Sequence, residues 1–127
     1  MAASEVEALS SSEDQVVLLV TSMPSTSIIE GNQNVVRQAF RGRKIKFVEL
    51  DGMDQAKKET RNRLFGISEK RGVFPQVFTQ IDGDIAFIGD FDTLNSLNDC
   101  DALPPDVLEA NPQIQTITSV FKRFIAD

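Results

Sequence analysis

The stretch PQVFTQIDGDIAFI, residues 75–88, decides the fold class of this chain. Two apolar runs, 76–81 and 84–88, flank Asp82-Gly83. An Asp-Gly pair between two such runs favours a tight two-residue turn, so the stretch predicts an antiparallel β-hairpin. Pro75 precedes the first strand, where a proline is tolerated.

Strands and helices alternate before the hairpin. Residues 15–21 form an apolar run that predicts a buried strand, and residues 44–50 predict a second strand. A helix is expected between them over 27–42, where Ser27 and Glu30 have the spacing of a capping box. A second and largely polar helix is expected from Asp54, a good N-cap residue, to Phe65.

A third helix is expected after the hairpin, starting within residues 89–92 and ending near Cys100. The order is therefore β-α-β-α-β-β-α. Two crossovers followed by a hairpin and a closing helix predict an α/β sheet with helices on its faces, in one domain over residues 15–103. Residues 1–14 are rich in Ser and Glu and carry no apolar period, so we expect a disordered acidic tail.

A C-terminal extension over residues 104–127 follows Pro104-Pro105. Asn111-Pro112 is a helix start signal, and residues 112–126 predict an amphipathic helix. Two uses of its apolar stripe stay open. The stripe packs on its own domain, or it docks on a partner with Ile117, Phe121 and Phe124 as anchors.

Composition excludes several functions. The chain has no histidine and one cysteine, which rules out the common zinc ligand sets, an internal disulfide and any Ser-His-Asp or Cys-His site. The formal net charge of −6 disfavours nonspecific nucleic-acid binding. No apolar run approaches the length of a membrane span, and the first residues do not resemble a signal peptide, so we expect a cytoplasmic protein that binds neither nucleic acid nor membrane.

Three segments carry a family resemblance. They are KIKFVELD at 44–51, PQVF at 75–78 and IGDFD at 88–92. In this order and spacing the chain resembles the SH3-domain-binding glutamic-acid-rich-like family, whose members are related to glutaredoxins. The resemblance implies a thioredoxin-like fold of the glutaredoxin type with an added C-terminal helix. The proline-rich SH3 ligand and the glutamate-rich tail of that family are absent, so SH3 binding is not expected.

The resemblance also places a site. Glutaredoxins carry Cys-Pro-x-Cys in the turn after the first strand, where a helix N-terminus lowers the thiol pKa. This chain has Met23-Pro24-Ser25-Thr26 there. A thioether has no proton to lose and no histidine can activate a hydroxyl, so we expect no catalytic residue. Cys100 is predicted to be a partly buried structural thiol.

A cleft for a peptide or small ligand is what the resemblance leaves. It would contain Met23, Pro24, Ser25, Thr26, Phe74, Pro75, Gly89, Asp90, Phe91 and Asp92. Pro75 is expected to be cis, and Phe74 to offer its backbone to an extended peptide. Residues 89–92 match the place where glutaredoxins hold glutathione, but Asp90 adds negative charge there, and capping of the third helix by Asp90 or Asp92 is the simpler alternative.

The sequence thus predicts a redox-inactive, glutaredoxin-like interaction or adaptor module, or a subunit of a larger assembly, without metal or cofactor. Its expected partner is another protein of unknown identity. The alternative is a glutathione-binding redox-regulatory protein or oxidoreductase.

Overall fold

The computed structural model describes residues 13–126. Its elements are β1 (Gln15–Val20), α2 (Ser27–Gly42), β2 (Phe47–Asp51), η1 (Gln55–Lys57), α3 (Lys58–Ser68), β3 (Gln76–Ile81), β4 (Asp84–Asp90), α4 (Phe91–Asp101), α5 (Pro105–Ala110), α6 (Ile117–Val120) and η2 (Lys122–Phe124). The predicted order of strands and helices up to α4 is confirmed. The predicted tail at 1–14 lies outside the described residues, except for Glu13 and Asp14.

The four strands form one mixed sheet in the order β2-β1-β3-β4. β2 runs parallel to β1, while β3 is antiparallel to both β1 and β4. The two central strands are the most buried, because both of their faces are covered: every residue of β1 after Gln15 is buried, and every residue of β3 before Ile81. The sheet is therefore of the mixed α/β kind that the element order predicts.

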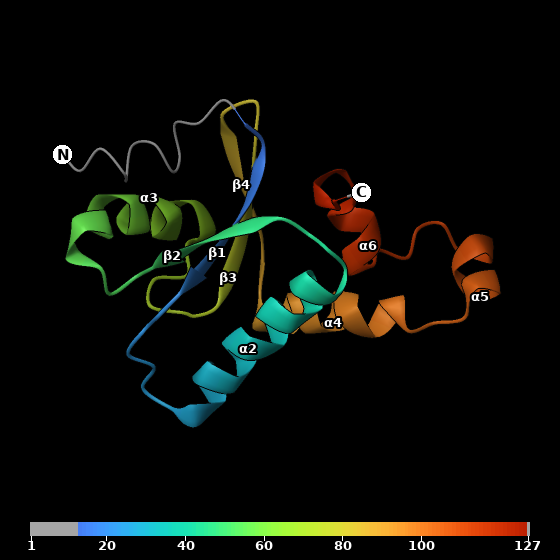
Figure 1. Ribbon diagram of the computed structural model, residues 1–127, viewed down its shortest axis with the longest axis horizontal. Coiled ribbons are helices and arrows are strands. Elements are labelled where there is room, and N and C mark those ends of the chain that lie inside the picture. Colours follow the sequence, from blue (N-terminus) through green and yellow to red (C-terminus); the bar gives the residue numbers. More distant parts are fainter. Residues whose placement is uncertain (1–12, 127) are drawn as a thin grey trace.

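Helices cover the two faces of the sheet (Figure 1). On one face α3 brings Leu64 and Phe65 against Val17, Leu19 and Phe78. On the other face α2, α4 and the C-terminal segment pack on alternate residues of the same strands. This alternation follows from the two-residue period of a strand, which sends successive side chains to opposite faces.

The hairpin forms as predicted. Asp82 and Gly83 have φ values of 54° and 84°, the left-handed pair that a type I′ turn needs. The Phe74–Pro75 bond is cis, which confirms that prediction. β4 extends to Asp90, two residues beyond the expected end of the strand.

β2 starts three residues later than predicted. Lys44 has a φ of 58°, and the N–H of Ile45 donates to Phe40 O at 2.9 Å, so the chain is still leaving α2 at this point. Ile45 makes an isolated antiparallel bridge with Ile125 instead. The predicted start of this strand at residue 44 is therefore wrong.

The C-terminal segment is not one helix. α6 has four residues and starts at a capping box made by Thr116 and Ser119, and a short 3-10 turn follows it. Ile117, Phe121 and Phe124 are 1%, 0% and 7% exposed. Phe121 packs edge-on against Phe40 of α2, with ring centroids 5.1 Å apart. The docking hypothesis for these three residues is wrong, because they complete the core of their own chain.

Polar contacts fix this segment in place. Asp101 at the end of α4 accepts hydrogen bonds from the Thr118 N–H at 3.1 Å and from Arg43 Nε at 2.9 Å. Arg43 follows α2, so a single carboxylate connects α2, α4 and α6. At the other end of the segment, Asp14 pairs with Arg123 and accepts the Asp82 N–H at 3.0 Å.

Candidate functional site

The turn between β1 and α2 is the first part of the candidate site. Met23 is 71% exposed, and its N–H donates to Thr21 Oγ1 at 3.1 Å. Thr26 is the N-cap of α2, since its hydroxyl accepts the Ile29 N–H at 3.2 Å. The capping box predicted at Ser27 and Glu30 is therefore one residue out of register. Pro24 is half-buried and Ser25 is exposed, so the hydroxyl of Ser25 faces solvent.

Asp51 holds the turn from the end of β2. Its Oδ1 accepts the Ser22 N–H at 3.1 Å and the Met53 N–H at 2.9 Å. Partial burial raises the pKa of Asp51, but these hydrogen bonds and the charge of Lys57 outweigh it and leave the pKa below its ordinary value. Asp51 therefore stays ionised and ties two loops together at neutral pH.

Gln33 fixes the base of the same turn. Its side chain is 2% exposed, although it stands in the apolar stripe of α2. Gln33 Oε1 accepts the Thr21 N–H at 2.7 Å, and its Nε2 donates to Thr21 O at 3.2 Å. The end of β1 would otherwise leave two buried backbone groups without a partner. Gln33 thus makes the two hydrogen bonds with Thr21 that a neighbouring strand would otherwise make.

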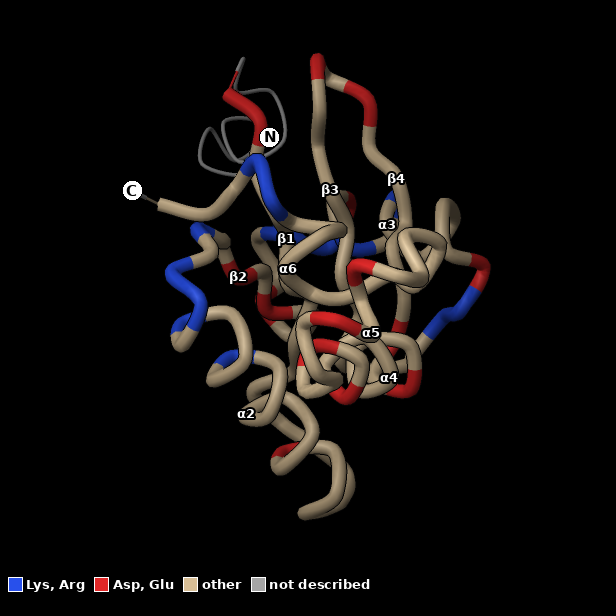
Figure 2. Tube along the Cα trace, turned by 90° about the vertical axis from the view of Figure 1, so that its right-hand side faces the viewer, with Lys and Arg blue, Asp and Glu red and all other residues tan. Residues whose placement is uncertain are grey.

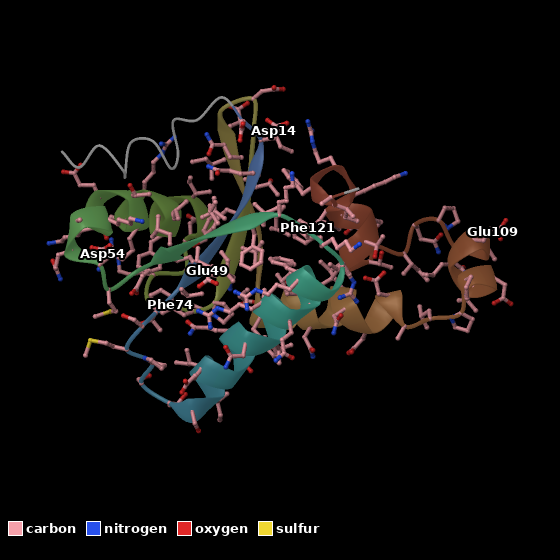
Figure 3. The ribbon with its side chains drawn as sticks, in the orientation of Figure 1. Asp14, Glu49, Asp54, Phe74, Glu109 and Phe121 are labelled. Carbon is pink, nitrogen blue, oxygen red and sulfur yellow. The ribbon has the colours of Figure 1, made fainter. Side chains whose placement is uncertain are left out.

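The cis-proline loop is the second part. Pro75 is buried and Phe74 is half-buried. The ring of Phe74 meets Phe65 of α3 edge-on at 5.8 Å and covers Gly52, where a Cβ would lie 2.8 Å from it. Phe74 lies at the end of the sheet where β1 runs into the turn (Figure 3). Gly52 is therefore needed for the close approach of the two loops.

Gln76 anchors the loop before the proline. Its Nε2 donates to Lys70 O and Val73 O, both at 2.7 Å. The Gln76 side chain is fully buried, and its Oε1 has no hydrogen-bond partner among the described residues. The contacts of Nε2 fix the orientation of the amide, because a flipped amide would set an oxygen against two carbonyls. Gln76 thus holds the loop that presents Phe74.

The N-terminus of α4 is the third part. Asp90 is its N-cap, with Thr93 N–H donating to Asp90 Oδ1 at 3.4 Å, and Asp90 also pairs with Lys70 Nζ at 3.6 Å. Gly89 is buried against the Thr93 side chain, where a Cβ would come within 2.4 Å. Phe91 packs on the core and Asp92 is exposed. The capping role is confirmed for Asp90.

The sheet register brings the three parts together. Leu19 pairs with Gln76, and Gln76 pairs with Asp90, so the turn, the cis-proline and the start of α4 lie at the same end of the strands. All ten predicted cleft residues lie there. Two surface hollows, of about 560 and 670 Å³, are lined by other residues. The candidate site thus combines an exposed thioether with a backbone that side-chain hydrogen bonds hold in place.

Redox chemistry has no thiol at this surface. Cys100 is half-buried near the far end of α4, about 14 Å along the helix axis from Phe91. Among residues 13–126, no group of His, Cys, Asp and Glu is placed to hold a metal ion. The arrangement can bind through backbone groups and apolar contact, and it offers no nucleophile with an activating base.

Four residues of the site were missed by the sequence analysis: Gln33, Asp51, Gly52 and Gln76. Gln33 gives the clearest signal, since it is a polar residue at a core position of an amphipathic helix, between Ile29 and Val36. Asp51 ends β2 and Gly52 follows it, where turn residues are common. Their contacts join parts of the chain that are distant in sequence, which a local pattern does not reveal.

No family model matches the chain, and no curated protein matches it. Within the part of the chain that the structure describes, none of the helices combines the length and apolar character needed to cross a membrane.

Proposed function

We propose that this chain is a redox-inactive, glutaredoxin-like interaction module that binds an extended segment of a partner protein at the edge formed by Met23, Phe74–Pro75 and the start of α4. The observation that carries the proposal is the pairing of a cis-proline loop with a turn that has methionine where an oxidoreductase has its thiol. Such a surface can bind an extended peptide through its backbone groups, but it lacks the thiol that disulfide exchange requires.

The surroundings of the site support binding of a peptide. Met23, Met53 and Val73 are 71%, 40% and 40% exposed, so apolar side chains surround the site. Methionine is flexible and polarizable, and it adapts to different apolar side chains. The strand order β2-β1-β3-β4 and the cis-proline at the start of β3 are the features that a thioredoxin-like fold implies.

Asp90 argues against the glutathione alternative. Its carboxylate already caps α4 and pairs with Lys70. A glutathione carboxylate at this helix N-terminus would meet a negative charge and would have to displace an existing cap.

The first prediction is that the purified chain reduces no mixed disulfide of glutathione above the rate without protein. Met23 is the reason, because a thioether cannot form the mixed-disulfide intermediate. A coupled assay with glutathione, glutathione reductase and NADPH measures the rate. Turnover that disappears in Cys100→Ser would contradict the prediction and support the oxidoreductase alternative.

Peptide binding is tested with a matched pair of variants. Peptides are selected from a random display library against the wild-type chain, and their affinities are measured for Met23→Lys and Ile28→Lys. The two side chains are 71% and 70% exposed, so both changes place a lysine at an equally exposed position. We expect Met23→Lys to weaken binding at least tenfold while Ile28→Lys leaves it unchanged. Equal affinity of both variants would refute the proposed site.

A further inference from the structure

A second interaction surface lies along the open edge of the sheet. β2 is an edge strand, because within residues 13–126 the strand order places β1 beside it and no strand on its other side. An edge strand carries a row of backbone groups that can pair with another strand. The start of this edge is closed, since Ile45 donates its N–H to Phe40 O and bridges Ile125. From Phe47 onward, no strand of the described residues lies on this side of β2.

The direction of each backbone group follows from one hydrogen bond. Gly52, directly after β2, donates its N–H to Val20 O of β1 at 2.7 Å. Since backbone groups point alternately to the two sides of a strand, Leu50 and Val48 also face β1. The N–H and C=O groups of Phe47 and Glu49 therefore face the open edge.

Positive charge lies on both sides of this edge. Figure 2 shows Lys and Arg gathered along α2 and the segment leading into β2, while Asp and Glu gather near α4 and α5. On the α2 side, the Arg41 guanidinium lies over the Phe47 ring at 5.8 Å. The Arg41 side chain is 66% exposed, and its ion pair with Glu49 is long at 3.8 Å, while Arg37 binds the same carboxylate at 2.9 Å.

The opposite side of the edge has Lys46 and Val48. Both side chains are exposed, Val48 to 40%, and alternation along the strand places them on the face away from α2. Lys46 forms no ion pair with any residue of the described range 13–126, although Glu13 and Asp14 line the same hollow. An incoming strand would thus find cations on both faces and one apolar contact.

A second copy of the chain fits this edge poorly. In an antiparallel pair, opposite residues are either both hydrogen-bonded or both not, so an outward-facing residue pairs with an outward-facing one. The Lys46 N–H already donates to Phe124 O at 3.0 Å, so Lys46 is not free to pair with the outward-facing Glu49 or Asp51 of a second copy.

We propose that β2 accepts an acidic, extended segment of a partner protein as a fifth strand. Backbone pairing with Phe47 and Glu49 would provide the binding, and carboxylates beside Arg41 and Lys46 would select the sequence. A small apolar residue of the segment would cover Val48. This surface uses other residues than the Met23 site, and it does not depend on the function proposed there.

The probe is a fluorescent, end-blocked seven-residue peptide that alternates Glu and Val. Binding is followed by fluorescence anisotropy at low salt, and amide exchange is measured by NMR. We expect the peptide to bind and to slow exchange of the Phe47 and Glu49 amide protons. A peptide that alternates Lys and Val should not bind, and neither should one that alternates Glu and Pro, because it has too few N–H groups to pair.

Two charge reversals locate the interaction. Lys46→Glu should weaken binding about fivefold, as expected for an exposed charge at the rim of an interface. Lys58→Glu on α3 changes the net charge equally and should leave the affinity unchanged. Met23→Lys should also have no effect, which separates this result from the test of the other site.

Three results would overturn the proposal. Peptide binding without protection of Phe47 and Glu49 would place the peptide elsewhere. Equal weakening by Lys46→Glu and Lys58→Glu would show attraction to charge alone. A dimer in sedimentation, with both amides already protected in the absence of peptide, would show that a second copy occupies the edge.

Discussion

Gln33 shows how one buried side chain can organise a functional turn. Its amide satisfies both backbone groups of Thr21, so the chain can leave the sheet at that residue without a buried donor or acceptor lacking a partner. The direction in which the turn departs, and hence the place of Met23, depends on this amide.

Gln33→Leu should lower the free energy of unfolding by about 2 kcal/mol, since the Thr21 N–H and C=O would stay buried without partners. Chemical denaturation measures the loss. Gln38→Leu is the matched control on the exposed side of α2 and should change stability by less than about 0.5 kcal/mol. Equal effects of the two variants would show that the hydrogen bonds between Gln33 and Thr21 do not account for the loss of stability.

Asp51 makes a pH-dependent contribution. Because its pKa in the folded chain lies below the unfolded value, its carboxylate stabilises the fold at any pH above about 3.9, and this stabilisation is lost as the pH falls through the folded pKa. Asp51→Asn should therefore destabilise the protein at pH 7, and the difference in Tm from the wild type should shrink below pH 4. A difference that is constant between pH 7 and pH 3 would contradict this account.

Single residues were predictable where they act locally. Pro75 and the Asp82-Gly83 turn follow from backbone preferences that each residue carries with it. Met23 could be placed because its turn follows a strongly apolar strand. Gln33 could not be assigned a role, because its backbone partners belong to Thr21 in another element, and Gln76 could not, because its contacts with Lys70 and Val73 depend on the path of the loop between them.

At the scale of elements, α2 depends on its cap. Thr26→Ala should cost about 1 kcal/mol, since the Ile29 N–H would lose its acceptor at the start of a helix whose first turn is exposed. Ser25→Ala, one residue earlier and also exposed, should be neutral. Thermal unfolding of both variants measures the difference. An equal loss of stability in Ser25→Ala would contradict the assignment of Thr26 as the cap.

The C-terminal elements were the hardest to predict. The apolar residues of 112–126 recur at helical spacing, yet Thr116 caps a helix that ends after four residues, and Ile125 pairs with Ile45. α5 was missed because Pro104-Pro105 was interpreted as a helix breaker. Pro105 instead occupies the first position of the helix, where a backbone N–H would have no partner within the helix, so its absence carries no penalty. The spacing of apolar residues indicates which side chains are buried, whereas tertiary contacts determine the backbone conformation.

For the whole molecule, the C-terminal segment is part of the core. Removing every residue after Pro104 would uncover Phe40, Ile45 and the α2 side of the sheet. The truncated chain should lose cooperative thermal unfolding or aggregate. Phe121→Ala is the milder test and should cost about 3–5 kcal/mol, because the side chain is fully buried. Full stability of both variants would contradict the assignment of the segment to the core.

The bridge between Ile45 and Ile125 bears on how the protein is made. A ribosome synthesises β1 and α2 long before it reaches residue 125, so the contact of Phe40 with Phe121 cannot form while the intervening residues are made. Contacts between segments this distant in sequence also close late in folding. We therefore expect Phe40 to be accessible to chaperones in the nascent chain until the C-terminal segment has been synthesised.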